Sequence, residues 1–219
     1  MSIRDNVAAV EERISAACAR SGRARTEVTL VAVSKTFPAS MIDDAIAAGL
    51  TEIGENRVQE ARDKKPSVLG AARWHLIGHL QSNKAKDAVR IFDVIQTVDS
   101  VPLAEKIGRA ADALGKQQDV LLEVNIGDEL QKSGVAAADL QALARDVRKI
   151  AALRVRGLMS IPPVESEERT RRYFRQLRAL RDALGMDELS MGMSDDFEIA
   201  IEEGSTMVRI GRAIFGSRD

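Results

Sequence analysis

The sequence of 219 residues has one cysteine, few aromatic side chains and almost no net charge. Because Cys18 has no partner for an internal disulfide, we expect a reducing compartment and therefore a cytoplasmic protein. A net charge of −1 gives no general attraction to nucleic acid or to an anionic membrane, and 3% aromatic residues argue against a base-stacking surface. No apolar run approaches the roughly 20 residues of a membrane span, and the polar start of the chain lacks the apolar segment of a signal peptide.

Several motifs of common enzymes are also missing from the sequence. Neither a Gly-x-Ser-x-Gly nucleophile elbow nor a Walker phosphate loop occurs. The two histidines, His75 and His79, have the four-residue spacing that holds zinc on a helix, but they flank a predicted strand and a loop and have no Cys ligands nearby. We therefore expect no metal site, and we interpret His75 as a hydrogen-bonded structural residue and His79 as a candidate for a pocket.

The hydrophobic pattern alternates between the period of strands and the period of helices. Ser2 and Asp5 have the spacing of a helix cap before an amphipathic helix over residues 3–20, and Cys18 lies on its apolar stripe as a packed thiol. After Gly22, eight strand-like segments follow, and each but the last precedes a helix. The predicted strands are 28–34, 51–53, 74–77, 94–98, 119–125, 155–160, 189–191 and 206–210, and the helices are 39–48, 56–65, 82–91, 100–114, one within 135–150, one from 166, and 195–203.

Strict alternation of strands and helices implies a parallel sheet. Eight such units predict an α/β fold of the (β/α)8 TIM type, a single barrel with an extra N-terminal helix, and the second choice is an open doubly wound sheet. No linker rich in Gly, Ser or Pro interrupts the pattern, so we expect residues 1–219 to form one domain. In a barrel of this type the functional site lies at the carboxyl ends of the strands.

A lysine at the end of the first predicted strand is the most informative single residue. Lys35 follows the apolar, β-branched run 28–34, which places it at the carboxyl end of a buried strand. The low dielectric there disfavours the ammonium, and a neutral amine can condense with an aldehyde, as the attachment of pyridoxal phosphate requires. The alternative is a lysine whose charge simply reaches solvent from the strand end.

Polar residues at the ends of the last two predicted strands could hold a phosphate. Gly211 and Arg212 follow the final strand, where such barrels commonly bind phosphate, and Gly211 would let the backbone approach closely. Ser194 could add a hydroxyl. It also matches an N-cap for the helix predicted to begin at Asp195, and the two roles are compatible.

Arg209 stands at the end of the last predicted strand. If its side chain faces inward, it could donate to a heteroaromatic nitrogen and keep that nitrogen unprotonated, because arginine itself stays protonated. Such a contact would make pyridoxal phosphate a weak electron sink. The alternative is a salt bridge with a carboxylate such as Glu52 or Glu202.

Six sequence blocks in a fixed order resemble the pyridoxal phosphate homeostasis protein family, the single-domain relatives of the alanine racemase barrel. The resemblance extends over nearly the whole chain and implies an alanine racemase-like barrel that binds pyridoxal 5′-phosphate. The blocks are Val31–Thr36, Gly54–Glu60, Trp74–Lys84, Gly157–Pro162, Leu189–Asp195 and Met207–Gly216.

The same resemblance implies a role for individual residues. It makes Lys35 the residue that holds the cofactor covalently as an aldimine, with Asn56 beside it. It also implies a polar but uncertain role for Lys132 near the ring. The remaining implied cofactor residues are Ser194 with the amides of Gly211 and Arg212 at the phosphate, Arg209 at the pyridine nitrogen, and Met193 and Ile210 as neighbours of the pocket.

One departure from the racemases limits the chemistry that we expect. Racemases take their second acid/base residue, a tyrosine, from an added domain and a partner chain. Here the only tyrosine, Tyr173, lies on a helix predicted to pack outside the barrel, and the chain ends four residues after Phe215. Racemisation by two bases needs groups on both faces of the carbanion. We therefore expect a monomeric, non-enzymatic protein that buffers pyridoxal phosphate and delivers it to apo-enzymes.

Two other functions stay open at this point. The first is a weak amino-acid racemase that depends on pyridoxal phosphate. The second is an aldolase that forms a Schiff base through Lys35 without any cofactor, because such chemistry also occurs on barrels.

Overall fold

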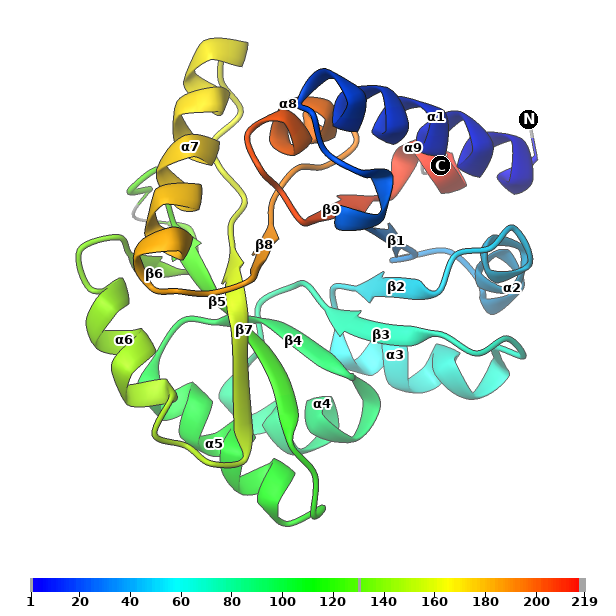
Figure 1. Ribbon diagram of the computed structural model, residues 1–219. Coiled ribbons are helices and arrows are strands. Elements are labelled where there is room, and N and C mark those ends of the chain that lie inside the picture. The colour runs from blue at the N-terminus through cyan, green and yellow to red at the C-terminus, as the bar shows by residue number, and fades with distance from the viewer. Residues whose placement is uncertain (1, 130, 217–219) are drawn as a thin grey trace.

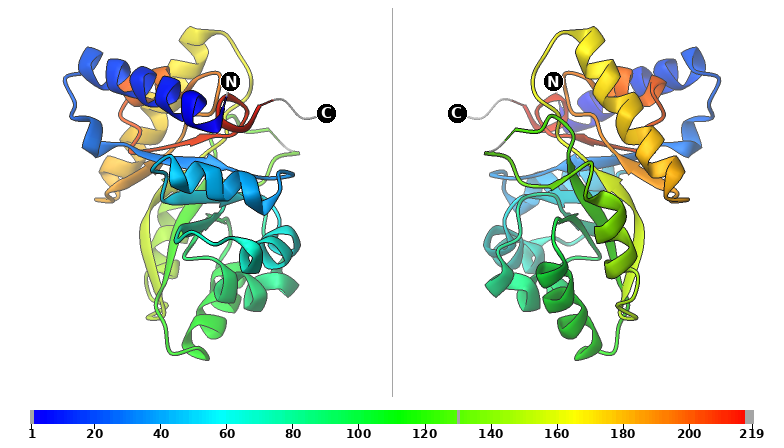
Figure 2. Two further views of the ribbon diagram at one scale, coloured as in Figure 1. Left: turned by 90° about the vertical axis from the view of Figure 1, so that its right-hand side faces the viewer. Right: turned by 90° about the vertical axis from the view of Figure 1, so that its left-hand side faces the viewer.

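The computed structural model describes residues 2–129 and 131–216, and its centre is a closed barrel of eight parallel strands (Figures 1 and 2). The barrel closes because the first strand pairs with both the second and the last, with Val31 opposite Glu52 on one side and Arg209 on the other. Closure excludes the open doubly wound sheet and confirms the predicted fold. The barrel strands, in spatial order, are β1 (Thr29–Val33), β2 (Glu52–Glu55), β3 (Arg73–Leu76), β4 (Val94–Val98), β5 (Gln118–Asn125), β7 (Leu153–Met159), β8 (Glu188–Ser190) and β9 (Met207–Ile210).

Helices surround the barrel on its outside (Figure 1). Their ends carry the signals expected from the sequence: Ser2 and Asp5 form a capping box on the first helix, and Pro102 lies in the first turn of the fifth. None of the helices among the described residues is both long and apolar enough to cross a membrane. The helices are α1 (Ile3–Arg20), α2 (Ala39–Ala47), α3 (Val58–Lys64), α4 (Ala85–Ile91), α5 (Val101–Asp112), α6 (Leu140–Val147), α7 (Glu167–Ala183), α8 (Phe197–Glu202) and α9 (Arg212–Phe215), with short 3-10 turns at Arg25–Glu27, Lys65–Ser67 and Ser82–Lys84.

The hydrophobic core lies mainly between the barrel and its helices. The apolar stripe of α1, which includes Ile14 and Cys18, packs into this layer, and Cys18 is only 1% exposed. Burial raises the pKa of the Cys18 thiol, as expected for a packed structural cysteine. Trp74 and Phe174 are buried in the same layer.

Two short elements differ from the prediction. Residues 135–136 form a strand, β6 (Val135–Ala136), which pairs with β5, and the helix that follows begins only at Leu140. Gly134 makes this pairing possible because its φ is +107° and a Cβ there would lie 2.6 Å from the backbone nitrogen of Asn125. The second difference is α9, a four-residue helix after the last strand, which the sequence pattern did not indicate.

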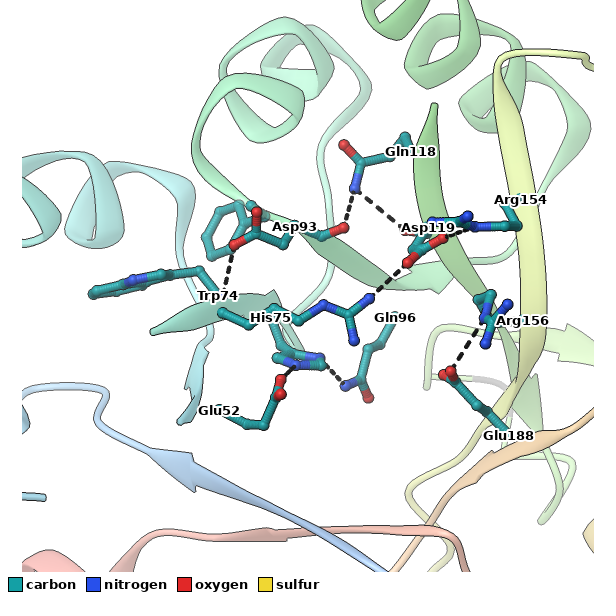
Figure 3. Close-up of polar contacts among 12 residues, drawn as sticks. Glu52, Trp74, His75, Asp93, Gln96, Gln118, Asp119, Arg154, Arg156 and Glu188 are labelled. Carbon is teal, nitrogen blue, oxygen red and sulfur yellow. Dashed lines mark hydrogen bonds and ion pairs between the residues drawn. The ribbon is translucent and has the colours of Figure 1, made fainter. Parts of the chain in front are cut away.

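Charged pairs occupy the end of the barrel where the strands begin (Figure 3). Asp119 of β5 accepts hydrogen bonds from Arg73, at 2.6 Å, and from Arg154. Arg156 donates to Glu188 at 3.2 Å. Because Arg73 and Asp119 come from strands on either side of β4, their contact ties non-adjacent strands together. The opposite end of the barrel, where the strands finish, contains a cavity.

Candidate functional site

A cavity of about 500 Å³ lies at the carboxyl ends of the barrel strands. This volume is within the usual range for a small-molecule site. Phe37, Ile77 and Ile161 supply apolar surface to the cavity, and none of them was singled out from the sequence. Seven of the eight predicted cofactor residues also line it, namely Lys35, Asn56, Met193, Ser194, Arg209, Gly211 and Arg212.

Lys35 is carried by a tight turn directly after β1. The turn begins at Ser34, whose amide donates to Gly54 O at 3.0 Å and whose hydroxyl donates to Glu55 at 2.6 Å. Thr36 follows with a φ of +72°, a left-handed conformation that costs a non-glycine residue energy. The Thr36 amide donates to the carboxylate of Glu60, which holds this conformation. The turn is therefore fixed on both sides of Lys35.

The ammonium of Lys64, on α3, stabilises this turn. Lys64 Nζ donates to Glu55 Oε1 at 2.7 Å, to Glu60 Oε1 at 2.9 Å and to Ser34 O at 2.9 Å. Glu55 is fully buried, and this desolvation raises the pKa of its carboxyl group although Lys64 and Ser34 act in the opposite direction. For Glu60, hydrogen bonds from Thr36 and Lys64 outweigh burial, so its pKa is lowered. Lys64 thus links α3 to the turn that carries Lys35.

Arg209 lies on β9, the strand that pairs with β1, lines the same cavity as Lys35 and is only 3% exposed. Its Nη1 donates to Ser190 Oγ at 2.7 Å and its Nη2 donates to Ser160 O at 3.0 Å. Burial lowers the pKa of Arg209 to about 10, with the charges of Asp196 and Glu123 acting against this shift, so the guanidinium stays protonated at neutral pH.

The alternative salt bridge of Arg209 with Glu52 or Glu202 is wrong. Glu52 instead accepts from His75 Nε2 at 2.5 Å, which confirms the structural role predicted for His75 (Figure 3). Glu202 pairs with Arg20 at 2.7 Å and with Arg171 at 2.8 Å on the outside of the barrel. The guanidinium of Arg209 is instead taken up by Ser190 Oγ and Ser160 O.

Ser194 lines the cavity but does not cap a helix. The predicted helix from Asp195 is shorter than expected, because α8 begins at Phe197 and its N-cap is Asp196. A turn comes first: the Met193 amide donates to Asp196 Oδ1 at 2.6 Å, and the Asp196 amide donates back to Met193 O at 3.2 Å. This turn uses the Asp196 side chain, which makes no capping hydrogen bond to α8, and it delays the start of the helix to Phe197. The capping interpretation of Ser194 is therefore wrong.

The end of the cavity near α9 combines backbone amides with charge. Gly211 precedes this helix and Arg212 begins it. The first amides of a helix have no acceptor within the helix, so they can donate to another group. Arg212 Nη2 also donates to Asp195 at 2.7 Å, in an exposed pair at the rim. Phe37 stacks on Phe215 with ring centroids 5.3 Å apart, which anchors α9 beside the cavity.

Three other predicted residues lie elsewhere. Ile210 is fully buried in the layer between barrel and helices, because it follows Arg209 on a strand and so points to the opposite face. Lys132 pairs with Glu129 in the loop after β5. Neither Ile210 nor Lys132 is part of the described cavity lining, and the same holds for His79.

Tyr173 lies on α7, outside the barrel, as the sequence predicts (Figure 1). Its side chain is partly buried against the outer hydrophobic layer. The one tyrosine of the sequence therefore does not line the cavity that holds Lys35 and Arg209.

Comparison with known proteins places the chain among proteins of similar length and fold. The model of the family described as "Alanine racemase, N-terminal domain" matches residues 6–219. The pyridoxal phosphate homeostasis protein of Escherichia coli K12 is 46% identical over 99% of this chain and 97% of that protein. A crystal structure of a protein from Bifidobacterium adolescentis is 41% identical, with a TM-score of 0.93 over 97% of this chain and 94% of that one. The structure of PipY from Synechococcus elongatus, with PLP bound, is 39% identical, with a TM-score of 0.86 over 98% of this chain and 100% of that one.

Proposed function

The chain belongs to the family of pyridoxal phosphate homeostasis proteins, which share the alanine racemase N-terminal domain, and from this premise we propose that it holds pyridoxal 5′-phosphate in the cavity above its barrel. The observation that carries the proposal is a strand-end lysine and a buried arginine that line one cavity of about 500 Å³. PipY, which has a similar fold, has PLP bound. The whole of residues 1–219 would act as one cofactor-binding domain.

The donors around the cavity fit the three polar parts of this cofactor. The amine of Lys35 would condense with the aldehyde and release water, which attaches the cofactor covalently. The hydroxyl of Ser194 and the amides of Gly211 and Arg212 would donate to the phosphate. Arg209, which is protonated and already oriented by Ser190 and Ser160, would donate to the ring nitrogen. Asn56 and Met193 would lie beside the ring, and Ile210 would contribute through its backbone only.

The proposed role is cofactor homeostasis without catalytic turnover. When bound, pyridoxal phosphate can act as an electron sink, and a protonated Arg209 at the ring nitrogen weakens that property. The E. coli relative is named as a homeostasis protein. Tyr173 lies outside the barrel, so it offers no second base to the cavity. We propose that the protein acts in the cytoplasm as a monomer and gives the cofactor to apo-enzymes.

Absorption spectroscopy tests the attachment. Purified protein mixed with pyridoxal phosphate should develop a visible absorption band that Lys35→Ala abolishes and that Lys149→Ala, a matched change at a surface lysine, preserves. Borohydride reduction followed by mass measurement should then find one cofactor-sized adduct on Lys35. A wild-type chain that never binds the cofactor would overturn the proposal, and a trapped adduct of a sugar phosphate without cofactor would indicate an aldolase instead.

Incubation of the loaded protein with single-enantiomer amino acids tests the absence of turnover. We expect each enantiomer to persist at the rate of the free cofactor control. Racemisation that is faster than this control and is lost in Lys35→Ala would replace homeostasis with a weak racemase.

A further inference from the structure

A chain of hydrogen bonds runs through the inside of the barrel from Arg209 to Glu52. Arg209 donates to Ser190 Oγ at 2.7 Å, and the Ser190 hydroxyl donates to Gln96 Oε1 at 2.7 Å. Gln96 Nε2 lies 2.9 Å from His75 Nδ1, and His75 Nε2 lies 2.5 Å from Glu52 Oε2. The last two contacts are visible in Figure 3. These five residues come from five different strands.

The chain crosses the barrel and does not follow its wall. Gln96 is on β4 and Ser190 is on β8, and neither strand pairs with the other in the barrel. Their side chains can therefore meet only across the interior. Gln96, Ser190 and His75 are all fully buried. In such surroundings an unmade hydrogen bond is costly, so each group depends on its neighbours in the chain.

The two ends of the chain require the same direction of donation. Arg209 can only donate, so the Ser190 oxygen accepts from it and the Ser190 proton goes to the carbonyl of Gln96. The amide nitrogen of Gln96 then faces His75, whose Nδ1 accepts. At the other end, the Glu52 carboxylate can only accept, which places the imidazole proton on Nε2. Both arguments give the same tautomer of His75 and the same orientation of Gln96.

The second hydrogen of the Gln96 amide is also used. It donates to the sulfur of Met207, 3.1 Å away. Reversing this amide would break its contact with Met207 and would turn donors toward the Ser190 hydroxyl. The orientation of Gln96 is therefore fixed from three sides, and through Ser190 it fixes one edge of the guanidinium.

Arg209 is otherwise held by a single backbone carbonyl, that of Ser160. Among the described residues, no ion pair includes Arg209, so a carboxylate does not set its position. Asp196 and Glu123 act on it only through longer-range charge. The Ser190 contact is the one side-chain hydrogen bond that orients this buried cation within the described structure.

We propose that Ser190 and Gln96, aligned by His75 and Glu52, are positioning residues that hold Arg209 in the orientation that recognises the ring nitrogen of the cofactor. We call the hydrogen-bond chain from Glu52 to Arg209 the relay. The inference rests on the proposed function for the identity of the ligand, whereas the relay consists only of residues of the protein. It assigns a role beyond packing to His75, which is buried inside the barrel and is not part of the described cavity lining. None of these side chains except Arg209 needs to touch the cofactor.

Serine variants test the relay through cofactor binding. Ser190→Ala removes one hydrogen bond to a charged group, and we expect about tenfold weaker binding of pyridoxal phosphate and a shifted absorption maximum. Ser190→Thr keeps the hydroxyl and should restore both. Ser205→Ala is the matched control, because Ser205 is equally buried but donates only to backbone carbonyls. Its affinity and spectrum should equal those of the wild type.

Nitrogen NMR of the histidine side chain tests the relay without any cofactor. In a His79→Gln background only His75 is left, and its signals should report a proton on Nε2 and none on Nδ1. Ser190→Ala should shift these signals because the Gln96 carbonyl loses its hydrogen-bond donor and the amide that contacts His75 is held less firmly, whereas Ser205→Ala should not. If Ser190→Ala fails to fold, Gln96→Met cuts the same chain and should weaken cofactor binding to the same extent.

The outcomes separate the two proposals. A wild-type chain that never binds pyridoxal phosphate overturns the proposed function. A wild-type chain that binds, together with a folded Ser190→Ala or Gln96→Met variant whose affinity, spectrum and His75 signals are unchanged, overturns the relay alone. A His75 proton on Nδ1 also overturns it.

Discussion

Removing the buried ammonium of Lys64 is the most direct test of how the Lys35 turn is held. Lys64→Met keeps most of the length of the side chain but leaves Glu55 and Glu60 without their shared partner. The Lys64 side chain is 9% exposed and that of Glu55 is 0% exposed, so water replaces little of what is lost. We expect the variant to lose stability and to bind pyridoxal phosphate more weakly, because Ser34 O also loses its donor.

The magnitude follows from the charge left behind on Glu55. Breaking a buried ion pair by removing one partner costs about 3–5 kcal/mol. Glu55 can escape part of this cost by taking up a proton. At pH 7, protonating a carboxyl with a pKa of 4.5 costs about 3.4 kcal/mol, at 1.36 kcal/mol for each pH unit. The loss of unfolding free energy at pH 7 should therefore be about 3 kcal/mol.

The pH dependence of this loss has a definite sign. In Lys64→Met the pKa of Glu55 in the folded state is raised further above its unfolded value, so the folded variant binds more protons than the unfolded chain between these two values. Its stability therefore falls as the pH rises from 4.5 through the folded pKa. The deficit against the wild type should be largest at neutral pH and should shrink as the pH approaches 4.5.

Urea unfolding at pH 7 and at pH 5 measures both the size and the sign. Lys86→Met, at an exposed lysine of α4, is the matched control and should change the unfolding free energy by less than about 0.5 kcal/mol. The double variant Lys64→Met with Glu55→Gln should recover much of the lost stability, because no buried charge is left at position 55. Two results would refute the reasoning. One is a Lys64→Met variant as stable as Lys86→Met at pH 7, and the other is a loss of unfolding free energy, relative to the wild type, that is larger at pH 5 than at pH 7.

Three further predictions concern other parts of the molecule. Gly78→Ala should lower the melting temperature and weaken cofactor binding, because its Cβ would lie 2.2 Å from Asn56 O, and unchanged calorimetric and binding data would contradict this. Asp195→Asn should tighten cofactor binding about threefold by releasing the exposed Arg212, and this gain should disappear in 1 M salt, as titrations at two salt concentrations can check. Cys18 should react with a thiol reagent only when the protein unfolds, because it is 1% exposed and burial raises its pKa, so fast labelling in the native state would refute its placement.

The barrel and the floor of its cavity follow from local patterns. Alternating strands and helices determine a parallel closed sheet, and closure places the residues after each strand at one end, which is why Lys35 and Arg209 meet in one cavity. Period-two alternation also explains why the Ile210 side chain packs in the outer layer while Arg209 lines the cavity, since neighbours on a strand point to opposite faces. Applied strictly, this rule would have separated Ile210 from Arg209 in advance.

Other parts of the site depend on contacts that no local pattern encodes. Ser190 and Gln96 are 94 residues apart in the sequence, and their hydrogen bond exists only because the closed barrel brings β8 and β4 face to face. Lys64 belongs to a helix of polar sequence, and such a sequence by itself indicates a solvent-exposed side chain. In the structure its ammonium instead donates to Ser34 O, 30 residues away in the sequence. The cap of α8 was misplaced for a related reason, because a turn between Met193 and Asp196 decides among three consecutive polar residues.

Two hydrogen-bond networks support the inner part of the cavity, one around Lys64 and one that ends at Arg209, whereas the rim near Arg212 is exposed. The turn that carries Lys35 is held through Glu55 and Lys64, and the guanidinium of Arg209 is held through Ser190, so the protein itself positions the turn at Lys35 and the buried cation. Preordered groups lose little entropy on binding, which favours tight retention. The Arg212 side chain at the rim is 61% exposed and paired with Asp195, so the proposed phosphate end of the site would face water. A site that positions the arginine proposed for the ring nitrogen and leaves the proposed phosphate end accessible suits the proposed role, because a recipient protein could approach the cofactor from that end.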